Sequence, residues 1–194
     1  MNKPKINGAT KLTNSRFLNL CELDIQHRNG AASKYHVASR AKSVDDLCAM
    51  SSNTKPDAVA ILAMLDNKIV LIKQYRYPVG DYIYELPAGI IDEDEDTITA
   101  AKREMFEETG LKFVPYPLQF LNRPLFSSPG MTDETCAVVV GQCYGTPTNN
   151  NQEDSEDIEV VLVDRKEALR ILNEEKVDMR TAWALIPIYG LFNE

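Results

Sequence analysis

The chain has 194 residues, of which 44% are hydrophobic and 26% charged, and its formal net charge is −8 at pH 7. This length allows one domain with a sizeable core. The negative charge argues against a general nucleic-acid binder, but a bound cation and a few arginines would still allow a small anionic substrate. No stretch reaches the roughly 18 apolar residues of a membrane span, and the first ten residues lack a signal-peptide core. We therefore expect a cytoplasmic protein with neither membrane nor nucleic-acid partners.

The four cysteines form no CxxC pair and have no neighbouring histidines at zinc-binding spacing. We expect reduced, mostly buried thiols.

The N-terminal part of the chain predicts short antiparallel strands. Arg16–Gln26 and Lys34–Ser39 flank the sequence His27-Arg28-Asn29-Gly30, in which Asn-Gly indicates a hairpin turn. Residues 51–57 form a loop by composition.

Two hydrophobic strands and a short aromatic strand come next. Ala58–Leu65 and Ile69–Gln74 are separated by Asp66-Asn67-Lys68, which predicts a second hairpin. Tyr82–Leu86 is expected to be a strand that Pro87 ends.

The segment Thr97–Thr109 has the periodicity of a helix, with Ile98, Ala101 and Met105 on its buried side. Acidic residues crowd its start, where they complement the helix dipole, and Gly110 stands where a helix-ending glycine belongs.

The rest of the chain predicts further strands, a polar loop at Gly145–Glu156 and two closing helices. The strands are Leu118–Arg123, Thr135–Tyr144 and Ile158–Val163, and the helices are Arg165–Glu174 and Met179–Gly190. Strands with helices at irregular intervals indicate an α/β sandwich with a mixed sheet and not a doubly wound parallel fold. We expect residues 1–55 to form an N-terminal β extension and residues 56–194 the main domain.

The sharpest motif spans the predicted helix and the segment before it. It fits the pattern Gly-x5-Glu-x7-Arg-Glu-U-x-Glu-Glu-x-Gly-U, where U is apolar, and a chance match in a chain of this length is on the order of 10⁻⁷. The matching residues are Gly89, Glu95, Arg103, Glu104, Met105, Glu107, Glu108, Gly110 and Leu111.

Three glutamates of this motif stand on one helical face. Glu104, Glu107 and Glu108 are spaced i, i+3 and i+4, so their carboxylates project together and repel one another. Such a cluster is either a solvated acidic face or a site for a hard cation such as Mg²⁺, which prefers oxygen ligands.

The complete motif is a Nudix box, and with it the chain resembles the Nudix hydrolase family. The resemblance implies a Nudix-type α/β/α sandwich and a dependence on Mg²⁺ or Mn²⁺. It implies that Glu104 and Glu108 are the principal metal ligands, that Glu107 shares the metal or orients its water, and that the carbonyl of Ala88 is a further ligand. Glu95 and Arg103 are assigned to positioning, since the family pairs them.

Segments around the box resemble the ADP-ribose pyrophosphatase branch of the family. These are the sequence Lys73-Gln74-Tyr75-Arg76-Tyr77-Pro78, the sequence Tyr84-Glu85-Leu86-Pro87-Ala88-Gly89, and a proline-glycine loop at residues 128–131. GDP-mannose pyrophosphatases share much of this pattern, so the resemblance implies a nucleoside diphosphate sugar as substrate.

The same resemblance selects candidate substrate-binding residues. Arg76 is expected to clamp a phosphate, the alternative being a surface ion pair. Glu85 is expected to support the metal site, the alternative being a solvated strand residue. The other candidates from the resemblance are Arg40, Pro129, Gly130 and Met131. Tyr35 is a candidate for stacking on the base, the alternative being an aromatic residue packed on its strand.

The branch takes its general base from a mobile loop before the last main strand. The acidic segment 152–157 fills that place, and its register favours Glu156 over Glu153. The alternative is a disordered acidic loop without a catalytic role.

Base recognition and assembly follow the branch only in part. Relatives often stack adenine between aromatics of the N-terminal strands, whereas the single tryptophan here, Trp183, lies in the last predicted helix and is expected in the core. By resemblance, the N-terminal extension packs across a partner in a homodimer and helps to build the pocket.

Two other functions stay open. A non-catalytic module that senses a nucleotide sugar would normally have an eroded box, whereas this box is complete. A Nudix enzyme for damaged nucleoside triphosphates would normally lack the N-terminal extension and the Pro129-Gly130 loop.

Overall fold

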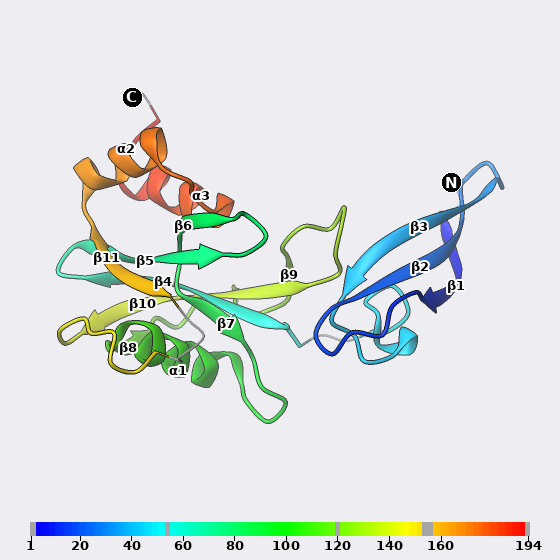
Figure 1. Ribbon diagram of the computed structural model, residues 1–194, viewed down its shortest axis with the longest axis horizontal. Helices are drawn as coiled ribbons and strands as arrows, with labels where there is room; N and C mark the ends of the chain where they lie inside the picture. The colour runs from blue at the N-terminus through cyan, green and yellow to red at the C-terminus, as the bar shows by residue number, and fades with distance from the viewer. Residues whose placement is uncertain (1–2, 53–54, 119–120, 153–156, 193–194) are drawn as a thin grey trace. The chain divides into compact units, whose positions relative to one another are not determined.

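The computed structural model describes residues 3–52, 55–118, 121–152 and 157–192. The chain divides into two compact units. The first contains Met1–Asp57 and Arg123–Cys136, and the second contains Ala58–Asn122 and Ala137–Glu194. Figure 1 shows the elements of both units, and each unit is described by itself.

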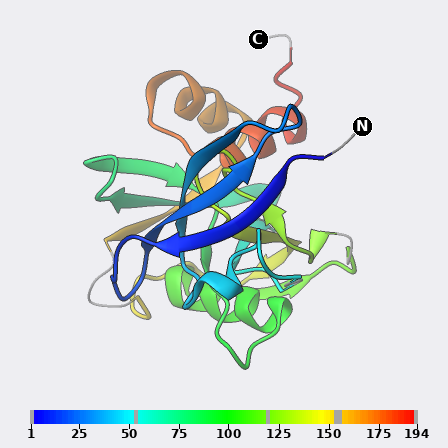
Figure 2. The same ribbon diagram turned by 90° about the vertical axis from the view of Figure 1, so that its right-hand side faces the viewer.

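The first unit contains a three-stranded antiparallel sheet in the order β1-β2-β3 (Figure 2). Its strands are β1 (Lys5–Lys11), β2 (Asn19–Gln26) and β3 (Ala32–Ser39), followed by the short 3₁₀ helix η1 (Val44–Asp46). Cys21, Leu23 and Leu47 form its small core. The hairpin predicted around Asn29-Gly30 is confirmed, with φ of +87° at Gly30. β1 was not predicted.

The segment 123–136 belongs to the same unit and lies against β3. Its short strand β9 (Leu125–Phe126) pairs with Thr135 and Cys136. The Ala38 amide donates to the carbonyl of Met131 at 2.9 Å. The proline-glycine loop is thus tied to the N-terminal sheet.

The second unit is built on a large sheet whose main path runs β11-β5-β4-β10-β8, with β6 paired to β5 and β7 paired to β4. Val177 adds a parallel bridge to Tyr84, whereas β5 pairs antiparallel with β4, β6 and β11. The strands are β4 (Ala58–Leu65), β5 (Lys68–Arg76), β6 (Asp81–Glu85), β7 (Ala88–Ile90), β8 (Lys112–Pro115), β10 (Thr135–Tyr144) and β11 (Ile158–Val163).

Helices cover both faces of this sheet. α1 (Thr97–Thr109) lies on one face, and α2 (Arg165–Glu174) and α3 (Met179–Ile188) lie on the other (Figure 1). The predicted α/β/α sandwich with a mixed sheet is therefore confirmed. None of the helices in the described residues is long and apolar enough to cross a membrane.

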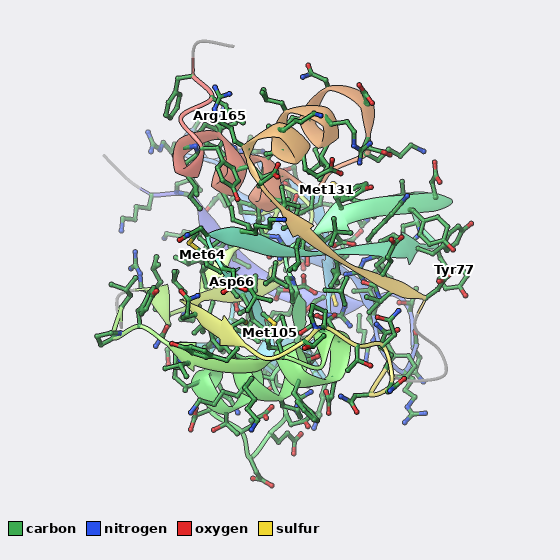
Figure 3. The ribbon with its side chains drawn as sticks, turned by 90° about the vertical axis from the view of Figure 1, so that its left-hand side faces the viewer. Met64, Asp66, Tyr77, Met105, Met131 and Arg165 are labelled. Carbon is green, nitrogen blue, oxygen red and sulfur yellow. The ribbon has the colours of Figure 1, made fainter. Side chains whose placement is uncertain are left out.

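The helix predicted at Thr97–Thr109 is confirmed with both of its ends. The Asp96 carboxylate caps its start by accepting from the amides of Ile98 and Thr99 at 2.8 and 2.9 Å. Gly110 ends it in the left-handed conformation, with φ of +71°. Met105 is fully buried between the helix and the sheet (Figure 3), so the opposite face of α1 is held in a fixed orientation.

The predicted hairpin between β4 and β5 is also confirmed. Asp66 and Asn67 have φ of +48° and +63°, as a tight two-residue turn requires.

All four cysteines are free, and three are buried. Burial raises the pKa of the Cys143 thiol to about 12.

Two predictions were wrong. Leu118 and residues 121–123 form no strand, because Leu121 turns back to the Leu118 carbonyl; the strand in this region is β8. Trp183 is not in the core and is 69% exposed. Thr181 and Leu185 take the buried face of α3, and a residue midway between them must point away.

Replacement of Gly141 tests the packing of β10 on β8. A Cβ atom at Gly141 would lie 2.3 Å from the Val114 carbonyl oxygen and 2.7 Å from the Phe113 ring. A backbone carbonyl cannot move aside as the end of a side chain can. We therefore expect Gly141→Ala to lower the free energy of unfolding, measured in urea, by about 1–3 kcal/mol. Gly130→Ala, which meets nothing within 4 Å, is the matched control. Equal stability of the two variants would contradict this packing.

Candidate active site

The carboxylates of Glu104 and Glu108 reach the same short stretch of backbone. The Ala88 amide donates to Glu108 Oε2 at 3.1 Å, and Glu108 is only 2% exposed. A Cβ atom at Gly89 would lie 1.9 and 2.4 Å from the two carboxylate oxygens of Glu104. Glycine is therefore required at position 89, since any side chain would displace this carboxylate.

Arg103 organises the acidic residues around it. Its guanidinium binds Glu95 through two hydrogen bonds, Nε to Oε1 at 3.0 Å and Nη2 to Oε2 at 2.8 Å. Nη1 donates to Glu104 at 2.8 Å and to Glu107 at 2.9 Å. Nη2 also donates to the Ile90 carbonyl at 3.0 Å, which ties the helix to β7.

These contacts shift the protonation equilibria of the pair. The hydrogen bonds from Arg103 hold the pKa of the Glu95 carboxyl below its usual range, and the bound carboxylates raise the pKa of Arg103. Both groups are thus charged at neutral pH. The pairing of Glu95 with Arg103 fits the positioning role expected for them.

The donor chemistry of this site fits a hard divalent cation. Within the described ranges, no three His, Cys, Asp or Glu side chains are gathered as a metal site, and Glu104 and Glu107 both contact the Arg103 guanidinium. Even so, the carboxylates of Glu104 and Glu108 meet at Ala88 and Gly89, where the missing side chain of Gly89 lets the Glu104 carboxylate approach the backbone. Carboxylate and carbonyl oxygens are the ligands that Mg²⁺ prefers.

Arg76 and Glu85 form an ion pair with two hydrogen bonds at the end of β5. Arg76 Nε donates to Glu85 Oε1 at 2.6 Å, and Nη2 donates to Oε2 at 3.1 Å. The side chain of Glu85 is 6% exposed and that of Arg76 is 40% exposed. Glu85 is therefore not a solvated strand residue. It orients Arg76, whose side chain is still partly exposed to solvent.

Arg180 is a residue of this region that the sequence did not suggest. Burial lowers the pKa of Arg76, whereas its contact with Glu85 and the charge of Glu108 raise it, and the net result is a raised pKa. The nearby positive charge of Arg180 opposes this rise. Arg180 is held by Asp178 at 3.0 Å, and the Asp178 amide donates to the Tyr84 carbonyl at 2.9 Å. Arg180 thus adds positive charge near Arg76, although no local motif marks it.

The other predicted substrate residues lie together in the first unit. The Tyr35 hydroxyl donates to the Gly130 carbonyl at 2.8 Å, and neighbouring Met131 is 72% exposed. Arg40 Nε binds Glu134 Oε2 at 2.7 Å. The structure therefore brings Tyr35 to the loop that contains Pro129, whereas the Arg40 guanidinium is paired with a carboxylate of its own unit.

The candidate bases Glu153 and Glu156 lie outside the described residues. Both neighbours of that segment are anchored. Gln152 Nε2 donates to the main-chain carbonyl of Glu108 at 2.9 Å, and the Asp157 carboxylate accepts a hydrogen bond from the Tyr82 hydroxyl.

Gly89→Ala tests the role of the close approach between β7 and α1. The new methyl group meets the end of the Glu104 side chain and not backbone, so the fold should lose no more than about 1 kcal/mol while the carboxylate is displaced. We expect kcat to fall by about 10–100-fold, the loss typical of disturbed metal ligation. Gly8→Ala, whose Cβ has an ordinary contact at 3.4 Å, should leave kcat unchanged. Full activity of Gly89→Ala would refute this role for Glu104.

Comparison with known proteins gives consistent results. Residues 54–182 match the NUDIX domain. The chain is 29% identical over 180 residues to the ADP-ribose pyrophosphatase of Bacillus subtilis, covering 90% of this chain and 86% of that protein. It is 34% identical over 122 residues to the ADP-ribose pyrophosphatase of Escherichia coli, covering 58% of this chain and 56% of that protein.

Among solved structures, one described as an ADP compounds hydrolase superposes with a TM-score of 0.67 at 20% identity. The superposition covers 98% of this chain and 95% of that chain. At this identity the likeness supports the fold.

Proposed function

The chain belongs to the Nudix family, and from this premise we propose that it hydrolyses the pyrophosphate bond of ADP-ribose or a related nucleoside diphosphate sugar. The observation that carries the proposal is the meeting of Glu104 and Glu108 at the Ala88-Gly89 backbone. The proposal is supported by the B. subtilis and E. coli relatives, which are named ADP-ribose pyrophosphatases.

Glu104, Glu108 and the carbonyl of Ala88 would hold Mg²⁺ or Mn²⁺, with Glu107 sharing the cation or orienting water. A bound cation supplies charge neutralisation at the diphosphate and lowers the pKa of water. Arg103 keeps Glu104 and Glu107 oriented through its hydrogen bonds, and Glu95 fixes the guanidinium in turn.

Arg76 would bind a phosphate oxygen of the substrate. Glu85 engages its Nε and one terminal nitrogen, so the guanidinium plane is fixed before substrate arrives. Such preorganisation lowers the entropy lost on binding. Arg180 adds to the positive potential that attracts the diphosphate.

In the reaction, a water oxygen attacks one phosphorus atom and the P–O bond of the anhydride breaks. The water proton passes to a general base, and the products are a nucleoside monophosphate and a sugar phosphate. We assign the base to Glu156, with Glu153 as the alternative. Comparison of Glu156→Gln with Glu153→Gln would identify the base by the larger loss of kcat.

We further propose a cytoplasmic homodimer in which Tyr35, Arg40 and the Pro129-Gly130-Met131 loop contribute to substrate binding. Exposed apolar side chains of the first unit support a partner surface, since Phe17 is 65%, Leu18 49% and Leu20 40% exposed. Light scattering at working concentration tests the homodimer, and a molecular mass that corresponds to a monomer would contradict this proposal.

Turnover of purified protein tests the proposed function. With millimolar Mg²⁺ or Mn²⁺ we expect release of AMP and ribose 5-phosphate from ADP-ribose. Glu108→Gln should lower kcat at least about 100-fold, because even the partners of metal ligands contribute about 10–100-fold.

Glu174→Gln, at a side chain that is 65% exposed on α2, is the matched control and should retain wild-type turnover. Preference for a nucleoside triphosphate over every nucleoside diphosphate sugar, in direct competition, would contradict the proposal. So would undiminished activity of Glu108→Gln.

A further inference from the structure

The residues just before α3 extend the sheet of the second unit beyond β6. Val177 forms a parallel bridge with Tyr84 of β6. The amide of Asp178 donates to the Tyr84 carbonyl at 2.9 Å. In this register Asp178 stands beside Glu85, the last residue of β6.

The side chains of Asp178 and Glu85 project from the same face of the sheet. Each follows one member of the bridged pair, and side chains alternate between the two faces along a strand. The contact between Lys176 and Asp81 agrees with this register, because their side chains pair at 2.8 Å on the face that Glu85 shares. Two carboxylates thus lie next to each other at this edge.

This face is the one that α1 covers. Arg76 and Val70 are six residues apart on β5 and share one face. Val70 belongs to the same core cluster as Met105 of α1. Because Arg76 binds Glu85, the carboxylates of Glu85 and Asp178 stand on the same side of the sheet as α1.

Each of the two carboxylates holds an arginine. Arg180 Nε donates to Asp178 Oδ2 at 3.0 Å, as Arg76 Nε donates to Glu85 Oε1 at 2.6 Å. The carboxylate is the less exposed partner in both pairs, with 6% against 40% for Glu85 and Arg76 and 20% against 36% for Asp178 and Arg180. An approaching anion therefore meets the guanidinium groups before the carboxylates.

The start of α3 does not depend on the Arg180 guanidinium. The Asp178 carboxylate already caps this helix by accepting from the amides of Arg180 and Thr181, at 3.0 and 3.4 Å. The guanidinium instead adds a positive charge that acts on Arg76, as the negative charge of Glu108 does. Two arginines of like charge are thus kept within electrostatic range of each other and of a predicted metal ligand, an arrangement that a bound anion would stabilise.

We propose that Arg180 contacts a phosphate oxygen of the substrate directly and forms, together with Arg76, a two-arginine clamp on the diphosphate. This proposal rests on the proposed function and adds a second phosphate-binding side chain to it. A diphosphate has more charged oxygens than a cation on α1 can bind, and guanidinium groups match the remaining ones with planar pairs of N–H donors.

The test measures binding of α,β-methylene ADP, whose bridge between the two phosphorus atoms cannot be hydrolysed. Calorimetry with the full chain and Mg²⁺ gives its Kd. We expect Arg180→Gln to raise this Kd at least about tenfold, the loss of a hydrogen bond between charged groups. Arg165→Gln, at an exposed arginine of α2 (Figure 3), makes the same change in net charge and should leave the Kd unchanged.

Ionic strength separates a direct contact from a long-range effect of charge. The Debye length falls from about 10 Å at 0.1 M NaCl to about 4 Å at 0.5 M NaCl, so long-range attraction is largely screened at the higher concentration. We expect the Kd of Arg180→Gln to stay well above that of the wild type at both concentrations. A difference that disappears at 0.5 M NaCl would overturn the proposal and leave Arg180 with a general electrostatic role.

Wild-type affinity of Arg180→Gln at 0.1 M NaCl would overturn the proposal as well. Should urea unfolding show that this variant is poorly folded, Arg180→Lys decides, because lysine keeps the charge and the helix propensity but lacks the planar pair of donors. Its Kd should also exceed that of the wild type, and equal affinity would overturn the proposal.

Failure of the proposed function gives a different result. A wild-type protein that binds α,β-methylene ADP but does not hydrolyse ADP-ribose would refute the activity, while the comparison of the Arg180 variants would still decide the clamp. A wild-type protein that hydrolyses ADP-ribose, with Arg180 variants of unchanged affinity, would refute the clamp alone.

Discussion

Repulsion among the carboxylates of α1 is the constraint on which the site depends. Glu104, Glu107 and Glu108 share one side of the helix, and like charges at this spacing destabilise a helix by roughly 0.2–0.5 kcal/mol per pair. The Arg103 guanidinium contacts two of these carboxylates, Glu104 and Glu107, in addition to that of Glu95, and reduces their mutual repulsion. The third carboxylate, that of Glu108, is almost fully buried and accepts a hydrogen bond from the backbone amide of Ala88. A divalent cation would relieve the same repulsion, which explains how an acidic face is tolerated in a rigid helix.

The scaffold keeps these carboxylates in place. Asp96 caps the start of α1, and Met105 anchors its inner face in the core. The end of the helix is packed against a distant loop, since the Thr148 amide donates to the Thr109 carbonyl at 2.9 Å and a Cβ atom at Gly110 would strike Thr148. The carboxylates therefore stand on a fixed element.

Local patterns predicted much of this arrangement. The helix with its glycine end, the hairpin turns and the spacing of the glutamates all follow from short-range rules, so the sequence located α1 and the acidic face. The pairing of Arg76 with Glu85 could not be derived in this way, because it depends on the register of β6 on β5. The position of Arg180 depends on tertiary packing for the same reason.

The errors have a similar origin. Leu118–Arg123 has a hydrophobic content that favours a strand, but the turn at Leu118 leaves the pairing with β10 to Lys112–Pro115. Trp183 was expected in the core as part of the last predicted helix, whereas Thr181 and Leu185 form the buried face of α3. In both cases the tertiary packing of neighbouring residues decides the outcome, and hydrophobicity alone does not.

Cation binding at α1 is the central claim, and anomalous diffraction from manganese-soaked crystals tests it most directly. The account predicts an anomalous peak within coordination distance of the Glu104 and Glu108 carboxylates, beside the carbonyl of Ala88. Absence of such a peak, with ADP-ribose or ADP bound at the site, would contradict it.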